Sequence, residues 1–203
     1  MTTFIYYVLK KATCKMDQLQ KFPQLESQRL ILREMTSGDL DFYFRHFNNP
    51  KIVEGTCFLG PKTLDAAKKE LERYCINPFK ENKGIRWGVV LKDVEVLIGT
   101  LGFYDWDKEV RKMEIGYDLE PKYWGLGIMT EALNAVVHFC FKTMRLNRIQ
   151  AIIPVGNHHS MNLVRRLGFK KEGILRQNSF FKGTYQDDLC FSLLREEWKE
   201  KTS

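Results

Sequence analysis

The sequence lacks an apolar run long enough to cross a bilayer, for which a helix needs roughly 20 apolar residues. Its apolar N-terminal stretch, FIYYVL, covers only Phe4 to Leu9. Lys10 and Lys11 follow this stretch instead of preceding it, which is the wrong order for a secretory signal. We therefore expect neither a membrane span nor an export signal, and we predict a cytoplasmic protein.

Cysteine and histidine are sparse and show no spacing typical of a metal site. The five cysteines are an odd number and form no CxxC pair: Cys14, Cys57, Cys75, Cys140 and Cys190. The four histidines contain no HExxH motif, and the neighbours His158 and His159 point to different faces without an acidic or thiol residue nearby in sequence. We expect reduced cysteines and no metal ion.

Basic residues are in excess, but they are not concentrated in one run. Lysine and arginine total 32 against 25 acidic residues, which gives a net charge of +7. Such a balance favours anionic partners, among them nucleotides, coenzymes, nucleic acid and acidic protein surfaces. No RNP-like motif, zinc finger or basic helix is present, so a nucleic-acid-binding module is the less favoured class.

Local patterns predict a single α/β domain with the element order βααβββαβαββ. Thr36 to Asp39 supply capping groups for the first helix, Asn48 to Pro50 are interpreted as its stop, and Thr63 caps the second helix. Expected strands cover 30–35, 86–91, 96–106, 112–119, 148–155, 171–180 and 189–194, and expected helices cover 36–47, 63–74, 127–144 and 159–167.

Two of these segments have a clear apolar face. The helix over 127–144 carries one apolar stripe, formed by Met129, Leu133, Val136, Cys140 and Met144. In the strand over 112–119 alternate residues share a face. Met113, Ile115, Tyr117 and Leu119 therefore lie on one side, and Glu114, Gly116 and Asp118 on the other.

Gly125 and Gly127 stand between this strand and this helix, within PKYWGLGIMTEAL. Glycine before a helix lets the backbone approach a ligand, and the free N–H groups of the first turn then form an anion site. A simple tight turn is the alternative. A dinucleotide-binding GxGxxG motif is excluded, because Thr130 replaces the third glycine and no acidic residue follows about 20 residues later. A GxxxxGK[ST] phosphate loop is absent as well.

KYWGLG, from Lys122 to Gly127, resembles the [QR]xxGx[GA] pyrophosphate loop of the GNAT superfamily of acetyl-CoA dependent N-acyltransferases, with Lys122 at the Gln or Arg position. About 30 residues later, NHHSMNLVRRLGF (157–169) resembles the second signature of the same superfamily. Together with Glu172-Gly173 and the later Gly183, Tyr185 and Asp187, the pattern is similar to the RimJ and RimL ribosomal-protein N-terminal acetyltransferases over roughly 25–198.

This resemblance implies a GNAT fold, an α+β arrangement in which one mixed, mostly antiparallel twisted sheet is flanked by helices. It places the acetyltransferase domain at 25–198, between an N-terminal extension (1–24) and a short tail (199–203). We expect Met1 to Lys15 to lie outside the catalytic domain. The alternative is that Phe4 to Leu9 add an edge strand or cover an apolar patch, for instance at a dimer contact.

The resemblance also assigns coenzyme contacts. The loop and first helical turn would hold the pyrophosphate through backbone N–H groups, with these residues: Lys122, Tyr123, Trp124, Gly125, Leu126, Gly127, Ile128, Met129 and Thr130. The strand containing Ile115, Gly116 and Tyr117 would run beside the pantetheine arm, and a bulge, to which Gly116 is suited, would aim one N–H at the thioester oxygen. An ordinary strand glycine is the alternative. Asn157 would bind the pantetheine or a bridging water, or else cap a helix.

Catalytic residues are less completely matched to the family. Many GNAT enzymes have a tyrosine that acts as the acid where this chain has Val164, so that role is vacant here. The resemblance to RimJ and RimL implies that Ser160 takes it instead; the alternative is that the Ser160 hydroxyl is a helix cap. Glu114 is the candidate base because it shares a face with Gly116, and a solvated or ion-paired glutamate is the alternative. Ser179 occupies the position where the resemblance would place a base glutamate, and this departure weakens the case for one dedicated base.

The resulting functional prediction is direct transfer of an acetyl group from acetyl-CoA, the cosubstrate, to an amine. A protein N-terminal α-amine, of ribosomal-protein type, is the first choice of acceptor, followed by a small amine, amino acid or antibiotic. A polyamine is disfavoured by the +7 charge unless the site itself is acidic. The alternative from another class is a non-catalytic coenzyme- or nucleic-acid-binding protein of this fold. A monomer or a homodimer is expected.

Overall fold

A single eight-stranded sheet forms the centre of the computed structural model, which describes residues 19 and 21–199. The strand order is β1-β2-β3-β4-β5-β6-β8-β7, and only the β5–β6 pair is parallel. The strands are β1 Leu25–Glu26, β2 Leu30–Glu34, β3 Ile85–Leu91, β4 Val96–Asp107, β5 Lys112–Leu119, β6 Arg148–Pro154, β7 Lys170–Phe181 and β8 Thr184–Leu194. The predicted mixed, mostly antiparallel sheet is confirmed.

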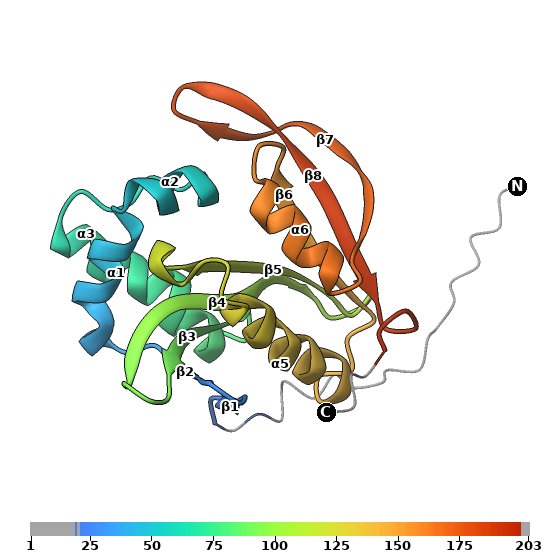
Figure 1. Cartoon of the computed structure of the whole chain (residues 1–203), viewed down its shortest axis with the longest axis horizontal. Helices are drawn as coiled ribbons and strands as arrows, with labels where there is room; N and C mark the ends of the chain where they lie inside the picture. The colour runs from blue at the N-terminus through green and yellow to red at the C-terminus, as the bar shows by residue number, and fades with distance from the viewer. Residues whose placement is uncertain (1–18, 20, 200–203) are drawn as a thin grey trace, which may run out of the picture.

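Helices cover both faces of this sheet (Figure 1). The α-helices are α1 Leu40–Phe47, α2 Pro50–Thr56, α3 Leu64–Leu71, α4 Asn77–Lys80, α5 Ile128–Lys142 and α6 His158–Arg166. Short helical turns precede α1 (η2, Ser37–Asp39), follow α3 (η3, Glu72–Ile76) and precede α5 (η4, Pro121–Tyr123). The expected capping is confirmed at both places, since Thr36 forms a capping box with Asp39 and the Thr63 side chain accepts from the Ala66 N–H.

Two helices and one strand were not predicted. The predicted stop after α1 is confirmed, but Pro50 is also the first residue of α2, where its missing N–H costs no hydrogen bond. Asn49 caps α2 by accepting a hydrogen bond from the Lys51 N–H. Helix α4 likewise has a proline in its first turn. The short β1 was missed, and β8 begins at Thr184 rather than at 189 because a tight turn at Lys182 and Gly183 joins it to β7.

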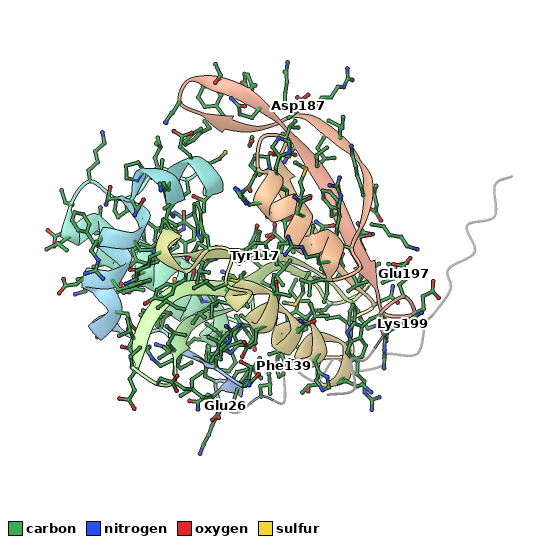
Figure 2. All side chains as sticks on the ribbon, in the orientation of Figure 1. Glu26, Tyr117, Phe139, Asp187, Glu197 and Lys199 are labelled. Carbon is green, nitrogen blue, oxygen red and sulfur yellow. The ribbon has the colours of Figure 1, made fainter. Side chains whose placement is uncertain are left out.

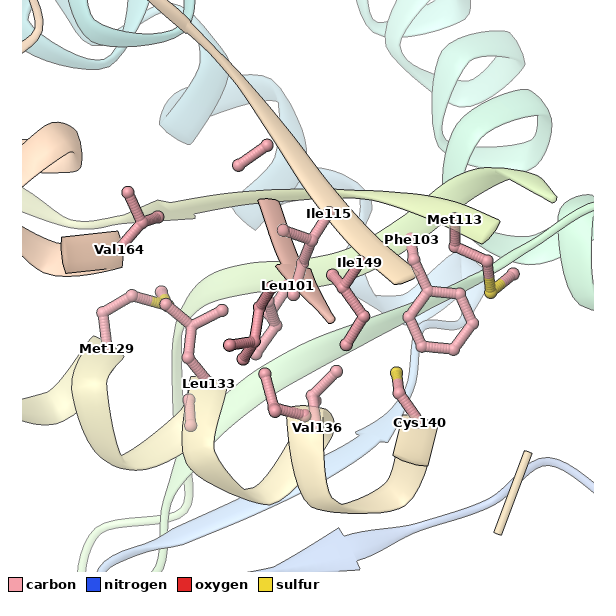
Figure 3. Packing of buried hydrophobic residues seen from close by; sticks show 14 of the residues in the cluster. Leu101, Phe103, Met113, Ile115, Met129, Leu133, Val136, Cys140, Ile149 and Val164 are labelled. Carbon is pink, nitrogen blue, oxygen red and sulfur yellow. The ribbon is translucent and has the colours of Figure 1, made fainter. Parts of the chain in front are cut away.

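The larger apolar core lies between the sheet and the helices α5 and α6. Figure 3 shows the predicted stripe of α5, with Met129, Leu133, Val136 and Cys140 directed at side chains of β4, β5 and β6. The expected alternation in β5 is confirmed too, because Met113, Ile115 and Leu119 are buried in this core. A second core packs α1, α2 and α3 on the opposite face of the sheet.

The residues immediately before β1 contact the domain. The Phe22 ring packs edge-on against Phe79 and Trp87, at 5.2 and 6.0 Å between ring centroids. Trp87 Nε1 donates to the Pro23 carbonyl at 2.6 Å. The expectation for Met1 to Lys15 lies outside the described residues, so the domain boundary stays a prediction. Within the part that is described, no helix has the length and apolarity needed to span a membrane.

Candidate active site

Strands β5 and β6 pair over only three residues and then separate. Lys112, Met113 and Glu114 pair in parallel with 148–150, whereas β6 stays paired with β8 as far as Pro154. From Ile115 to Leu119, no described strand pairs with the edge of β5 that faced β6. Helix α5 follows the diverging β5 and α6 follows β6 (Figure 1). This edge therefore offers backbone N–H and C=O groups to an extended ligand.

The bulge predicted at Gly116 is wrong. Gly116 pairs with Gly102 in a continuous register, and the only shift in the β4–β5 pairing lies between Tyr104 and Asp107. The glycine has a different structural cause. A Cβ at Gly116 would lie 3.1 Å from a ring carbon of Tyr104, so the tyrosine ring occupies the space above this residue. The open edge of β5, rather than a bulge, leaves its backbone unpaired by β6.

The two loop glycines adopt the conformation that favours glycine. Gly125 and Gly127 have φ of +77° and +73°, and a Cβ at Gly125 would meet no atom within 4 Å. Gly127 precedes α5 without a side-chain cap, and the first helical bond is from the Glu131 N–H to the Gly127 carbonyl at 3.0 Å. The N–H groups of residues 128–130 thus point out of a 15-residue helix with no described partner. This geometry fits a pyrophosphate.

A residue that the sequence analysis missed braces this loop. Arg29, just before β2, donates from Nη1 to the Leu126 carbonyl at 3.1 Å and pairs through Nε with Glu131 at 2.7 Å. Ser27 and the Arg29 N–H also donate to Glu131. Burial opposes ionisation of Glu131, but these hydrogen bonds hold its pKa below the ordinary value. Arg29 therefore ties the glycine loop to the first turn of α5, and its charge is balanced by Glu131.

The residues of η4 and the following turn lie close to the same loop. Lys122 is 63 % exposed and pairs with Glu120 at 3.2 Å, so its side chain faces solvent at the edge of the loop. Trp124 Nε1 donates to the Leu119 carbonyl at 2.6 Å, and its ring lies 6.2 Å from that of His159 in α6. The side chains of Ile128 and Met129 are buried in the core, which leaves their backbone for any ligand contact.

Asn157 caps α6 and also reaches α2. Its Oδ1 accepts from the Ser160 N–H at 3.0 Å, and its Nδ2 donates to the Gly55 carbonyl at 2.8 Å. The helix-cap alternative is therefore confirmed for Asn157 as the structure stands, while its predicted coenzyme contact stays a prediction. A second tie joins α2 to the β7–β8 hairpin, because Lys182 pairs with Glu54.

Ser160 is not the cap of α6, because Asn157 fills that position. Instead, its hydroxyl lies 2.5 Å from the hydroxyl of Tyr117 on β5. Figure 2 shows Tyr117 in the middle of the molecule, between the sheet and α6. Burial raises the pKa of Tyr117 to about 12, although the hydrogen bond with Ser160 acts in the opposite direction. Val164, one turn later, is fully buried in the core.

Glu114 lies at the point where β5 and β6 separate, on the same face as Gly116. Tyr104 donates from its hydroxyl to Glu114 Oε1 at 2.7 Å, and Gln150 Nε2 donates to Oε2 at 3.0 Å. Burial, and then the Glu114 carboxylate, raise the pKa of Tyr104 well above its ordinary value, so the phenol keeps its proton. Glu114 is thus held by two neutral donors. Ser179, by contrast, has a buried hydroxyl with no partner among the described residues.

A buried charged network fixes β5 near its C-terminal end, on the same face as Glu114 and Gly116. Asp118 accepts from the Thr100 N–H and hydroxyl at 2.9 and 2.6 Å, lies 2.8 Å from His46 Nε2, and pairs with Arg86. Burial alone would raise the pKa of Asp118, but Arg86 and His46 lower it to about 2. The described residues contain no group of three His, Cys, Asp or Glu placed to hold a metal ion.

Comparisons of this chain with known protein families, sequences and structures agree with this geometry. A family model described as an acetyltransferase (GNAT) domain matches residues 29–170. An uncharacterized N-acetyltransferase of Bacillus subtilis, YoaA, is 34% identical over 174 residues, which cover 86% of this chain and 98% of that protein. The [ribosomal protein uS5]-alanine N-acetyltransferase of Escherichia coli K12 is 30% identical over 183 residues, with 86% and 92% covered. The crystal structure of ribosomal-protein-S5-alanine acetyltransferase from Vibrio fischeri has a TM-score of 0.74 at 26% identity, with 87% and 99% covered.

Proposed function

The chain belongs to the GNAT acetyltransferase family and is an acetyl-CoA-dependent N-acetyltransferase, and we propose that its acceptor is the α-amino group at a protein N-terminus. The relative that acetylates an alanine of ribosomal protein uS5 supports this acceptor class, since it is similar along nearly its whole length. The proposed transfer step rests on the positions of Glu114 and Ser160, which lie on either side of the separating strands β5 and β6.

The coenzyme pyrophosphate is bound by backbone N–H groups from Gly125 to Thr130, in a loop that Arg29 braces; the Trp124 N–H is already engaged by the Pro121 carbonyl. The uncapped N-terminus of α5 and the open space at Gly125 support this assignment. Beside the pantetheine arm, Ile115 to Tyr117 supply the unpaired edge of β5. An N–H of this edge donates to the thioester oxygen, a contact whose removal typically costs about 3 kcal/mol of barrier.

Two pairs of side chains act on opposite faces of the sheet. Ser160 and Tyr117 belong to the face covered by α6, where the sulfur leaves. Glu114 and Tyr104 belong to the other face, from which the amine enters. The amine attacks the thioester carbon directly, so no acyl-enzyme is formed, and holding the two reactants together lowers the barrier. Glu114 accepts the proton that the amine loses.

The chemistry of Glu114 favours an α-amine over a lysine side chain. Both of its oxygens already accept hydrogen bonds from Tyr104 and Gln150, so a proton taken from the amine must displace one of these two donors. An α-amine with a pKa near 8 needs only about 1.4 kcal/mol to become neutral at pH 7, whereas a lysine near 10.4 needs about 4.6 kcal/mol. A site with a weak base is therefore better matched to the α-amine.

Acetyl-CoA turnover on a matched panel tests the acceptor. One peptide with a free N-terminus and no lysine is compared with the same peptide carrying a blocked N-terminus and one internal lysine, and with spermidine and free amino acids. We expect the first peptide to be acetylated, with the acetyl group located on its N-terminal residue by mass spectrometry. Preferred acetylation of the lysine, the polyamine or a free amino acid would refute the α-amine proposal.

A further inference from the structure

We propose that Tyr117 is a positioning residue for the leaving group: its phenol donates a hydrogen bond to Ser160 Oγ and thereby turns the serine proton toward the coenzyme sulfur. The inference rests on the proposed function, in which the Ser160 hydroxyl faces the departing thiolate. It assigns to Tyr117 a role in the transfer step that is separate from any contact of its backbone with the pantetheine arm.

The hydrogen bonds around Ser160 restrict the partners available to its hydroxyl. Its N–H is engaged by the Asn157 cap at 3.0 Å, so that group is not available to a ligand. The only described partner of Ser160 Oγ is the Tyr117 hydroxyl at 2.5 Å. The Tyr117 hydroxyl can also donate to the Ser160 carbonyl, but that contact is 3.5 Å long, so Ser160 Oγ at 2.5 Å is the better acceptor for the phenol proton. The two residues come from β5 and α6, the elements that border the separating strands.

The direction of the bond follows from the chemistry of the two hydroxyls. Each can donate or accept, but a phenol is the stronger acid and so the better donor. Burial keeps the Tyr117 phenol protonated across the neutral range, so this donor is not lost by ionisation. When the phenol proton points to Ser160 Oγ, the single serine proton is free to point elsewhere. Tyr117 thus converts a freely rotating hydroxyl into a directed donor.

Transfer of the acetyl group from sulfur to nitrogen needs no additional acid. As the N–C bond forms, the C–S bond breaks and its electron pair stays on sulfur, while Glu114 takes the amine proton. The Ser160 O–H donates a hydrogen bond to this thiolate and keeps its own proton, because a thiol with a pKa near 8.5 is a far stronger acid than serine. The thiolate is protonated by solvent after release. The pair acts only where negative charge develops on sulfur, so its loss lowers kcat more than coenzyme affinity.

A double-mutant cycle with Tyr117→Phe and Ser160→Ala tests the pair on whichever amine the enzyme acetylates. We expect Tyr117→Phe to lower kcat by about 2- to 10-fold, the range for one neutral hydrogen bond, with the KM for acetyl-CoA nearly unchanged. Ser160→Ala should cost at least as much, and the double variant should be no slower than Ser160→Ala alone. Tyr74→Phe, which removes a hydroxyl from an exposed tyrosine on η3, is the matched control and should keep full kcat.

The kinetic results distinguish the positioning role of Tyr117 from the role of Ser160 itself. If Ser160→Ala is slow but Tyr117→Phe retains full kcat, the positioning role is refuted while the role of Ser160 stands. Additive losses in the double variant would also refute it, because they would show that the two side chains act independently. A Tyr117→Phe protein that loses coenzyme affinity and melting temperature without a kcat-specific loss would make the phenol structural. Full kcat in Ser160→Ala would instead reject the proposed role of the serine itself.

Discussion

Replacing Gly125 by glutamate puts a side chain and a negative charge where the pyrophosphate is proposed to bind. The ideal Cβ at this position has no atom within 4 Å, so the protein itself can accommodate the new side chain. A non-glycine residue at φ +77° costs roughly 1–2 kcal/mol of stability. A carboxylate about 5 Å from one phosphate charge adds about 3 kcal/mol of repulsion at an effective dielectric constant near 20. This corresponds to a loss of acetyl-CoA affinity on the order of 100-fold.

Two control variants separate the contributions. Gly183→Glu introduces the same residue at φ +83°, also with no atom within 4 Å of its Cβ, but on the turn between β7 and β8. It should lower stability by a similar amount and leave the acetyl-CoA Kd unchanged. Gly125→Lys keeps the bulk and the backbone cost but reverses the charge, so it should lose less affinity than Gly125→Glu. Calorimetric titration with acetyl-CoA and a thermal melt measure both quantities. A folded Gly125→Glu protein with the original Kd would refute the assignment of this loop.

Three other predictions concern the base, the buried network and the N-terminus. Glu114→Gln should lower turnover by at least about 10-fold with an unchanged acetyl-CoA Kd, and equal turnover would show that Glu114 is not the base. Asp118→Asn should cost about 3–5 kcal/mol in urea unfolding because Arg86 stays buried without its partner; a loss below 1 kcal/mol would contradict this. Since the pKa of Asp118 is depressed to about 2, its stabilisation is complete above about pH 4 and is lost as the pH falls toward 2, a dependence that Asp118→Asn should remove. Deleting Met1 to Lys15 should preserve melting temperature, oligomeric mass and acetyl transfer, whereas a large drop in any of them would assign this segment to the working structure.

Local periodicity predicted the strand and the helix that flank the glycine loop. The apolar stripe of α5 and the alternation in β5 depend only on nearby residues, and both are present as expected. The turn expected at Gly125 and Gly127 was also read from local sequence, although their positive φ was not predicted. The predicted stop after Phe47 is confirmed, but α2 was missed because proline is compatible with both the end of one helix and the first residue of the next.

The contacts that complete the site join residues far apart in the sequence. Arg29 reaches Leu126 and Glu131 about one hundred positions away, and Tyr117 meets Ser160 on another element. No local pattern marks either pair, since each depends on how β2, β5 and α6 are packed. The bulge prediction at Gly116 was wrong for a related reason: the Tyr104 ring of the neighbouring strand crowds this glycine, and only the register of β4 and β5 places the ring there.

The distribution of charge near the site also differs from that of the whole chain. Glu114 and Asp188 share one face of the sheet, because their cross-strand partners Gln150 and Pro154 are an even number of residues apart on β6. Neither carboxylate is paired with a basic side chain in the described part of the chain, and Asp188 accepts only from Asn178. A protonated amine that entered from this face, as proposed, would therefore meet these carboxylates although the protein carries +7 overall. Because the Debye length in physiological salt is about 8 Å, such an amine would respond more to the charges that line this face than to the net charge of the chain.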